Sequence, residues 1–102
     1  MNQSIFNTIF AHYPELIRDM KNIFTSHEFI LHLARRYQAE YIELLYHYRH
    51  SPDSIHPAPF QIVHGFLAKH LSSLPDLVTN IGDVNSEDIF TKENRCANWR
   101  KV

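Results

Sequence analysis

Apolar residues recur at three- and four-residue intervals along the N-terminal quarter of the chain, which is the spacing of one face of an α-helix. The pattern covers Ile5 to Phe10 and stops before Pro14, a residue that disfavours helical geometry at Tyr13. It resumes from Leu16 to Phe24, and Pro14 suits the first turn of that second segment. The sequence therefore predicts two short amphipathic helices here.

The segment Thr25-Ser26-His27-Glu28 is typical of a capping box at the start of a helix. The Thr25 hydroxyl can accept a hydrogen bond from the Glu28 amide, while the Glu28 carboxylate reaches back to the Thr25 amide. No helix breaker follows until Ser51-Pro52, so we expect one long central helix from about Ser26 to Tyr48. Its predicted core face comprises Ile30, Leu33, Ala34, Tyr37, Tyr41, Leu44, Leu45 and Tyr48.

A second apolar side of this long helix is formed by Leu31, Ile42 and Tyr46. The helix expected from Pro59 to Leu74 also has a wide apolar face, to which Ile62 and Phe66 belong. Monomeric proteins seldom leave large apolar patches exposed. We therefore expect these five residues to contact a second copy of the chain or another protein.

The rest of the chain is predicted to consist of irregular segments and short helices. Residues 50–59 hold three prolines and should form an extended loop. Behind Pro75 the pattern predicts a short helix over Asp76–Ile81, closed by Gly82, and one more helical turn over 86–90. Residues 94–102 are expected to be a loosely packed tail. The predicted fold is all-α, a single compact domain over 1–102 of about five helices around one long central helix.

The composition of the chain limits the classes of function that we expect. The net charge is −1, so no global field draws the chain toward nucleic acid or anionic lipid. The lone Cys96 allows no internal disulfide and favours a reducing, cytoplasmic setting. No basic segment precedes a continuous apolar run, so we expect neither a signal peptide nor a membrane span. The only glycines, Gly65 and Gly82, form no phosphate-binding loop, and we expect no enzyme and no cofactor.

Eight histidines make metal binding worth testing. Glu43 and His47 lie one turn apart and project from the same helix face, and His50 and His56 follow toward the proline-rich loop. Carboxylate and imidazole groups bind metals such as zinc. The spacing matches no tight metal-binding signature, so a solvated strip with a hydrogen bond between Glu43 and His47 is the competing interpretation.

Residues 67–82 resemble a helix-turn-helix, because small and apolar residues fall where that motif packs its two helices together: Leu67, Ala68, Leu71, Val78 and Ile81. The second helix of this motif would have no Lys or Arg and would offer only Thr79 and Asn80 to bases. The basic tail adds groups that can contact phosphates or stack on a base: Arg95, Trp99, Arg100 and Lys101. Alternatively, Trp99 staples the tail onto the core.

Three functional hypotheses follow from these patterns. The first is a helical protein-interaction or regulatory module that self-associates as a homodimer or binds a protein partner, without catalytic activity. The second is a nucleic-acid-binding protein that uses the 67–82 hairpin and the basic tail. The third is a His-rich metal-binding protein centred on Glu43, His47, His50 and His56.

Overall fold

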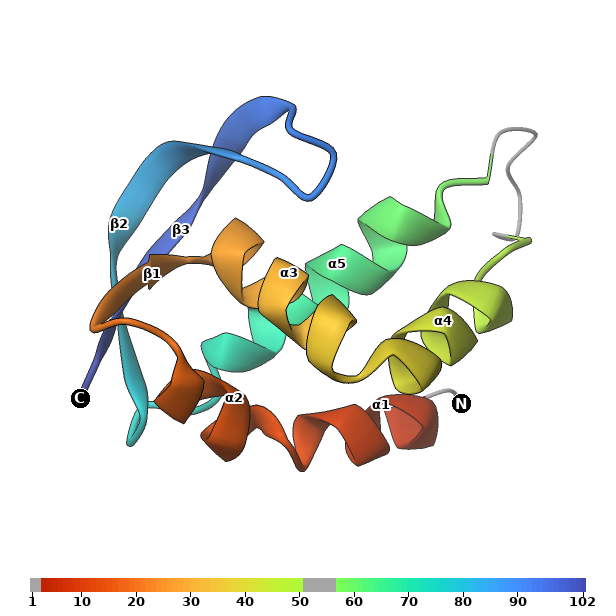
Figure 1. Cartoon of the computed structure of the whole chain (residues 1–102), viewed down its shortest axis with the longest axis horizontal. Helices are drawn as coiled ribbons and strands as arrows, with labels where there is room; N and C mark the ends of the chain where they lie inside the picture. The colour runs from red at the N-terminus through yellow and green to blue at the C-terminus, as the bar shows by residue number, and fades with distance from the viewer. Residues whose placement is uncertain (1–2, 51–56) are drawn as a thin grey trace.

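The computed structural model describes residues 3–50 and 57–102, and in these ranges five helices pack against a three-stranded antiparallel sheet (Figure 1). The helices are α1 (Gln3–Phe10), α2 (Tyr13–Asp19), α3 (Ser26–Arg36), α4 (Gln38–His47) and α5 (Pro59–Leu71). The strands are β1 (Ile23–Thr25), β2 (Val78–Glu87) and β3 (Glu93–Lys101), with β3 between the other two. The all-α prediction is therefore wrong, because the fold is mixed.

Strand β1 replaces the last part of the second predicted helix. Helix α2 ends at Asp19, because Met20 adopts extended backbone geometry with φ −77° and ψ 156°. Beyond it, Phe24 pairs with Trp99 of β3, and the alternation of a strand buries Phe24 while Ile23 stays 45% exposed. A strand this short is difficult to distinguish from helical spacing in a sequence, which explains the error.

Strands β2 and β3 form a long hairpin where the sequence predicted a helix over 76–81 and a loosely packed tail. Gly82, expected to close that helix, has φ +116° and lies at a register shift between Asn80 and Asp83. Glycine supplies the positive φ that such a β-bulge requires. The helix-turn-helix prediction for 67–82 is therefore wrong, because a strand follows α5.

The predicted long helix is two helices that meet at Tyr37. Its capping box is confirmed: the Glu28 amide donates to Thr25 Oγ1 at 3.1 Å, and the Thr25 amide donates to Glu28 Oε1 at 2.8 Å. At Tyr37 the backbone leaves helical geometry, with φ −125° and ψ 61°, and the Tyr37 hydroxyl donates to Glu15 of α2. Helix α4 then runs in a new direction (Figure 1). No Pro or Gly marks this break, so the sequence did not reveal it.

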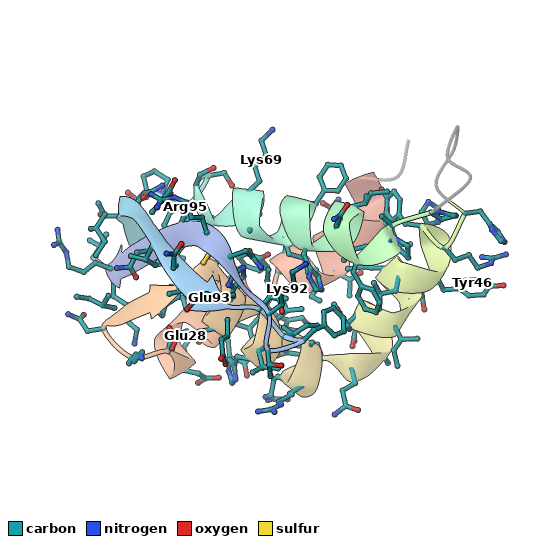
Figure 2. All side chains as sticks on the ribbon, turned by 90° about the horizontal axis from the view of Figure 1, so that it is seen from above. Glu28, Tyr46, Lys69, Lys92, Glu93 and Arg95 are labelled. Carbon is teal, nitrogen blue, oxygen red and sulfur yellow. The ribbon has the colours of Figure 1, made fainter. Side chains whose placement is uncertain are left out.

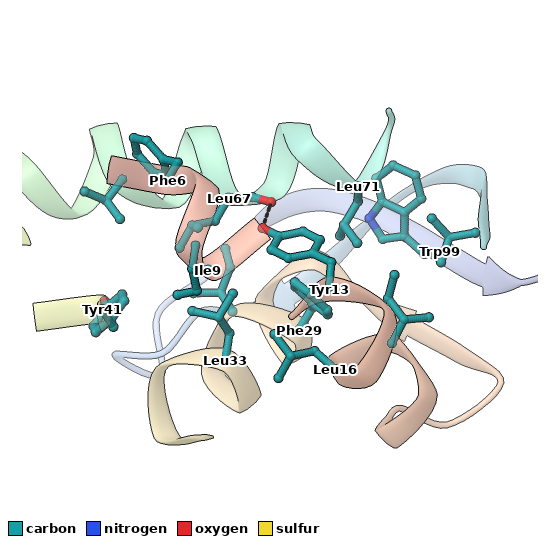
Figure 3. Packing of buried hydrophobic residues seen from close by; sticks show 14 of the residues in the cluster. Phe6, Ile9, Tyr13, Leu16, Phe29, Leu33, Tyr41, Leu67, Leu71 and Trp99 are labelled. Atoms are coloured by element: carbon teal, nitrogen blue, oxygen red, sulfur yellow. Dashed lines mark hydrogen bonds between the residues drawn. The ribbon is translucent and has the colours of Figure 1, made fainter. Parts of the chain in front are cut away.

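The helices and the sheet share one hydrophobic core (Figure 3). Its buried members are Phe6, Ile9, Tyr13, Leu16, Ile17, Phe24, Phe29, Ile30, Leu33, Tyr41, Leu44, Val63, Leu67, Leu71, Val78 and Trp99. Across this core the Tyr13 hydroxyl donates a 2.6 Å hydrogen bond to the Leu67 carbonyl and ties α2 to α5. Helix α5 ends at Leu71 rather than Leu74, and a turn leads from it into β2.

Candidate functional site

A groove of about 780 Å³ runs between α5 and the β2–β3 hairpin, with the first turn of α3 at its base. Its volume falls within the range of ligand-binding clefts. Helix α5 lines it with Phe60, Gln61, His64, Gly65, Ala68 and Lys69. The hairpin lines it with Asn80, Asp88, Phe90, Lys92, Asn94, Cys96, Ala97 and Trp99. Figure 2 shows Lys69 on α5 and Lys92 near the tip of the hairpin.

The base of the groove is held by a buried hydrogen bond. Trp99 of β3 is 3% exposed, and its indole N–H donates to the Ser26 hydroxyl at 2.9 Å. Ser26 is the first residue of α3, so the capping box places its hydroxyl where the indole can reach it. A buried indole N–H needs such a partner. This contact fixes the position of β3 against α3 and therefore the distance between the walls of the groove.

The tip of the hairpin folds back onto the first turn of α5. The sequence predicted a helical turn over 86–90, but residues 86 and 87 belong to β2 and the chain turns over 88–91. The Asp88 carboxylate accepts hydrogen bonds from the amides of Phe90 at 2.9 Å and Lys92 at 3.1 Å, and from the Asn94 side chain at 3.1 Å. Phe90 then meets Phe60 edge to face, with 4.8 Å between ring centroids. Burial opposes ionisation of Asp88, but these hydrogen bonds outweigh it and hold its pKa below the usual range.

Two histidines lie inside the groove. His64 Nε2 is 2.5 Å from the Tyr41 hydroxyl, with which it shares a hydrogen bond, and burial raises the pKa of Tyr41 to about 12, so the phenol keeps its proton at neutral pH. Burial lowers the pKa of His64, and nearby His27 lowers it further while Asp88 partly opposes both. His27 Nδ1 is buried and makes no hydrogen bond in the described structure. His64 is therefore neutral at pH 7.

The charge of the groove comes from few groups. Lys69 and Lys92 line it together with one acid, Asp88, so its lining carries a small positive charge. The Asp88 carboxylate is already engaged by the hairpin tip. Arg95 follows on β3 as an exposed cation, while Glu93 lies between it and Lys92 in the sequence (Figure 2). The groove can accordingly hold an anionic ligand that also makes hydrogen bonds.

The structure places the nucleic-acid candidates predicted from the sequence in different environments. Asn80 lines the groove, whereas Thr79 is exposed and pairs in the ladder with Arg100. Trp99 belongs to the core, which is the stapling role that the sequence left open. Lys101 Nζ donates to the Arg18 carbonyl at 3.0 Å, away from the groove lining.

The metal candidates are exposed: Glu43 lies in the middle of α4, His47 at its end and His50 just beyond it. His56 lies outside the described residues. Within 3–50 and 57–102, no three His, Cys, Asp or Glu side chains converge as a metal site would require.

The partner-binding candidates differ in exposure. Ile42 and Tyr46 are 61% and 62% exposed, one turn apart on α4, and Phe66 on α5 is 48% exposed. Leu31 and Ile62 are partly buried. Figure 2 shows Tyr46 pointing outward at the far end of the molecule from the hairpin.

Sequence reasoning missed most of the groove. Phe60, Gln61, Lys69, Phe90, Lys92 and Asn94 were not among its candidates. The signal that could have revealed them is the β-branched content of 78–87, with Val78, Thr79, Ile81 and Val84, which favours a strand and, with 93–101, a hairpin. A hairpin after α5 would have drawn attention to the side chains on both.

Comparisons of the chain with known protein families, with curated proteins and with solved structures give no match. Of the helices in the described ranges, none combines the length and the apolar character needed to cross a bilayer. The function must therefore be argued from the groove and the exposed surfaces.

Proposed function

We propose that the protein binds nucleic acid in the groove between α5 and the β2–β3 hairpin. The observation that carries this proposal is the lining itself, in which Lys69 from the helix and Lys92 from the hairpin join the amide side chains of Gln61, Asn80 and Asn94. Lysines bind phosphates, and amide groups can donate to and accept from base edges. We assign this activity to a reducing, cytoplasmic setting, because Cys96 is the chain's one cysteine and is free.

Gly65 offers a direct test, because it lines the groove and a Cβ added there would meet nothing within 4 Å. Gly65→Glu should keep the fold and place a negative charge where phosphates would lie. We expect fluorescence anisotropy with labelled oligonucleotides at low salt to show binding by the wild type and an affinity about tenfold or more weaker for Gly65→Glu.

The matched control is Gly65→Ala, which adds the same backbone restriction without charge and should bind like the wild type. Arg35→Ala serves as a second control, because Arg35 is an exposed cation at the end of α3 that does not line the groove. Equal binding by the wild type and Gly65→Glu, or no salt-sensitive binding at all, would refute the proposal.

A second candidate function is self-association through α4. It is favoured by the exposure of Ile42 and Tyr46, 61% and 62%, one turn apart on the same helix. Light scattering after size exclusion, at concentrations up to about 100 μM, should then show a dimer, since weak interfaces form in the micromolar range. Ile42→Glu should return it to a monomer of unchanged melting temperature. A wild type that stays monomeric throughout that range would rule this candidate out.

A further inference from the structure

We infer that the groove accepts a single, unpaired nucleic-acid strand rather than a duplex, with bases stacked on Phe60 and Phe90. This inference rests on the proposed function and names its substrate class. It is carried by two exposed aromatic side chains in the groove and by the position of the hairpin tip.

Phe60 and Phe90 form an aromatic platform at one end of the groove. Their rings meet at an interplanar angle of 81°, yet Phe60 remains 40% and Phe90 55% exposed. Each also lines the groove. Proteins that hold single strands combine such stacking surfaces with a cationic groove, because every unpaired base presents a face to stack. In a duplex the base faces are hidden by their neighbours, so these two rings would have nothing to stack on.

The polar lining fits the same ligand. Lys69 and Lys92 can hold the phosphates of one strand, while Gln61, Asn80 and Asn94 can reach the edges of bases that are not paired. The chain as a whole carries a net charge of −1 and offers no broad basic surface for the denser phosphates of a duplex.

The hairpin tip also lies beside α5, on the side from which a duplex would need to approach that helix. A recognition helix enters a major groove about 12 Å wide with its exposed face free. In this chain Phe90 lies against Phe60, the second residue of α5, and the hairpin runs beside that helix. Asp88 holds the tip in this position through its three hydrogen bonds. We expect a single strand, which is narrower than a duplex, to lie between α5 and the hairpin without moving either.

The test compares three labelled probes of one mixed sequence, about 15 nucleotides long, which exceeds the span of a groove of this size. They are a DNA strand, the RNA strand of the same sequence, and the DNA duplex. We expect at least one of the single strands to bind about tenfold more tightly than the duplex at low salt. A preference between the two strands then identifies DNA or RNA as the ligand.

Three phenylalanine variants provide the residue-level test. Phe60→Leu and Phe90→Leu keep an apolar side chain and remove the ring, and each should weaken single-strand binding about tenfold. Phe66→Leu is the control, because Phe66 is an exposed ring on the same helix that contacts Phe6 and does not line the groove. It should leave the affinity unchanged, and circular dichroism should show all three variants folded.

The outcomes separate the two proposals. Tighter binding to the duplex, or full single-strand binding by both Phe60→Leu and Phe90→Leu, overturns the single-strand inference and leaves the nucleic-acid proposal standing. Absence of binding to all three probes overturns both.

Discussion

At the scale of the residue, buried polar contacts hold the walls of the groove in place, and the burial of His64 makes the stability of the fold depend on pH. Tyr13 and Trp99 each donate a hydrogen bond across the core, to Leu67 at 2.6 Å and to Ser26 at 2.9 Å. An unpartnered buried donor costs about 1–3 kcal/mol, so these contacts favour one arrangement of α2 against α5 and of β3 against α3. His64 differs, because its hydrogen bond to Tyr41 lies in a buried place that disfavours the charged imidazolium.

His64→Gln should make the protein less sensitive to acid. Burial holds the pKa of His64 below its ordinary value of about 6.5. Above that value the folded and unfolded chains are both neutral at this residue. As pH falls below it, the unfolded chain takes up a proton that the folded chain resists, so the free energy of unfolding decreases. Glutamine stays neutral, and its amide can still form a hydrogen bond with the Tyr41 hydroxyl.

Urea unfolding at pH 7.5 and pH 5.5 measures this effect as the loss of stability between the two conditions. The loss should be smaller for His64→Gln than for the wild type. Some loss should persist, because burial also lowers the pKa of His70. His47→Gln, at an exposed position on α4, is the control. An identical loss in the wild type and in His64→Gln would show that His64 does not contribute.

At the scale of the element, the sequence was informative where a local interaction decides the structure and failed where a distant one does. The capping box was predictable because its two hydrogen bonds lie within four residues. The break at Tyr37 was not, since it is accompanied by a hydrogen bond to Glu15, on another helix. Strand β1 likewise exists only because Ile23 to Thr25 pair with 98–100 at the other end of the chain.

Thr25→Ala should destabilise the protein by about 1 kcal/mol, the usual cost of losing a side-chain helix cap. It removes the acceptor for the Glu28 amide and a 3.3 Å contact with the Ser86 hydroxyl of β2. For a domain of this size, that corresponds to a fall in melting temperature of roughly 4–8 °C. Thr8→Ala, at an exposed position on α1, should change the melting temperature little. Equal melting temperatures for the two variants would contradict a stabilising cap.

At the scale of the whole molecule, the candidate site could not be predicted from the sequence because distant segments build it together. Lys69 and Lys92 belong to a helix and a hairpin, and Ser26 at the base comes from a third element. No short motif contains them. The helix-turn-helix resemblance drew attention to part of α5, but it placed a helix where β2 forms one wall of the groove. For the candidate site, the composition indicated only that the net charge of the chain is close to zero.

That near-neutral charge makes the salt dependence of binding a measure of the groove alone. With a net charge of −1, long-range attraction is weak, and the release of counterions must come from the few local cations. If Lys69 and Lys92, the two cations that line the groove, each contact one phosphate of a single strand, the logarithm of the affinity should fall with that of salt concentration with a slope of about −1.4. Between 50 and 200 mM salt the affinity should therefore fall about sevenfold. Lys92→Ala should make the slope shallower by about 0.7, whereas Glu93→Gln should strengthen binding without reducing the slope. A slope near zero in the wild type, or one unchanged by Lys92→Ala, would show that these cations do not contact the phosphates.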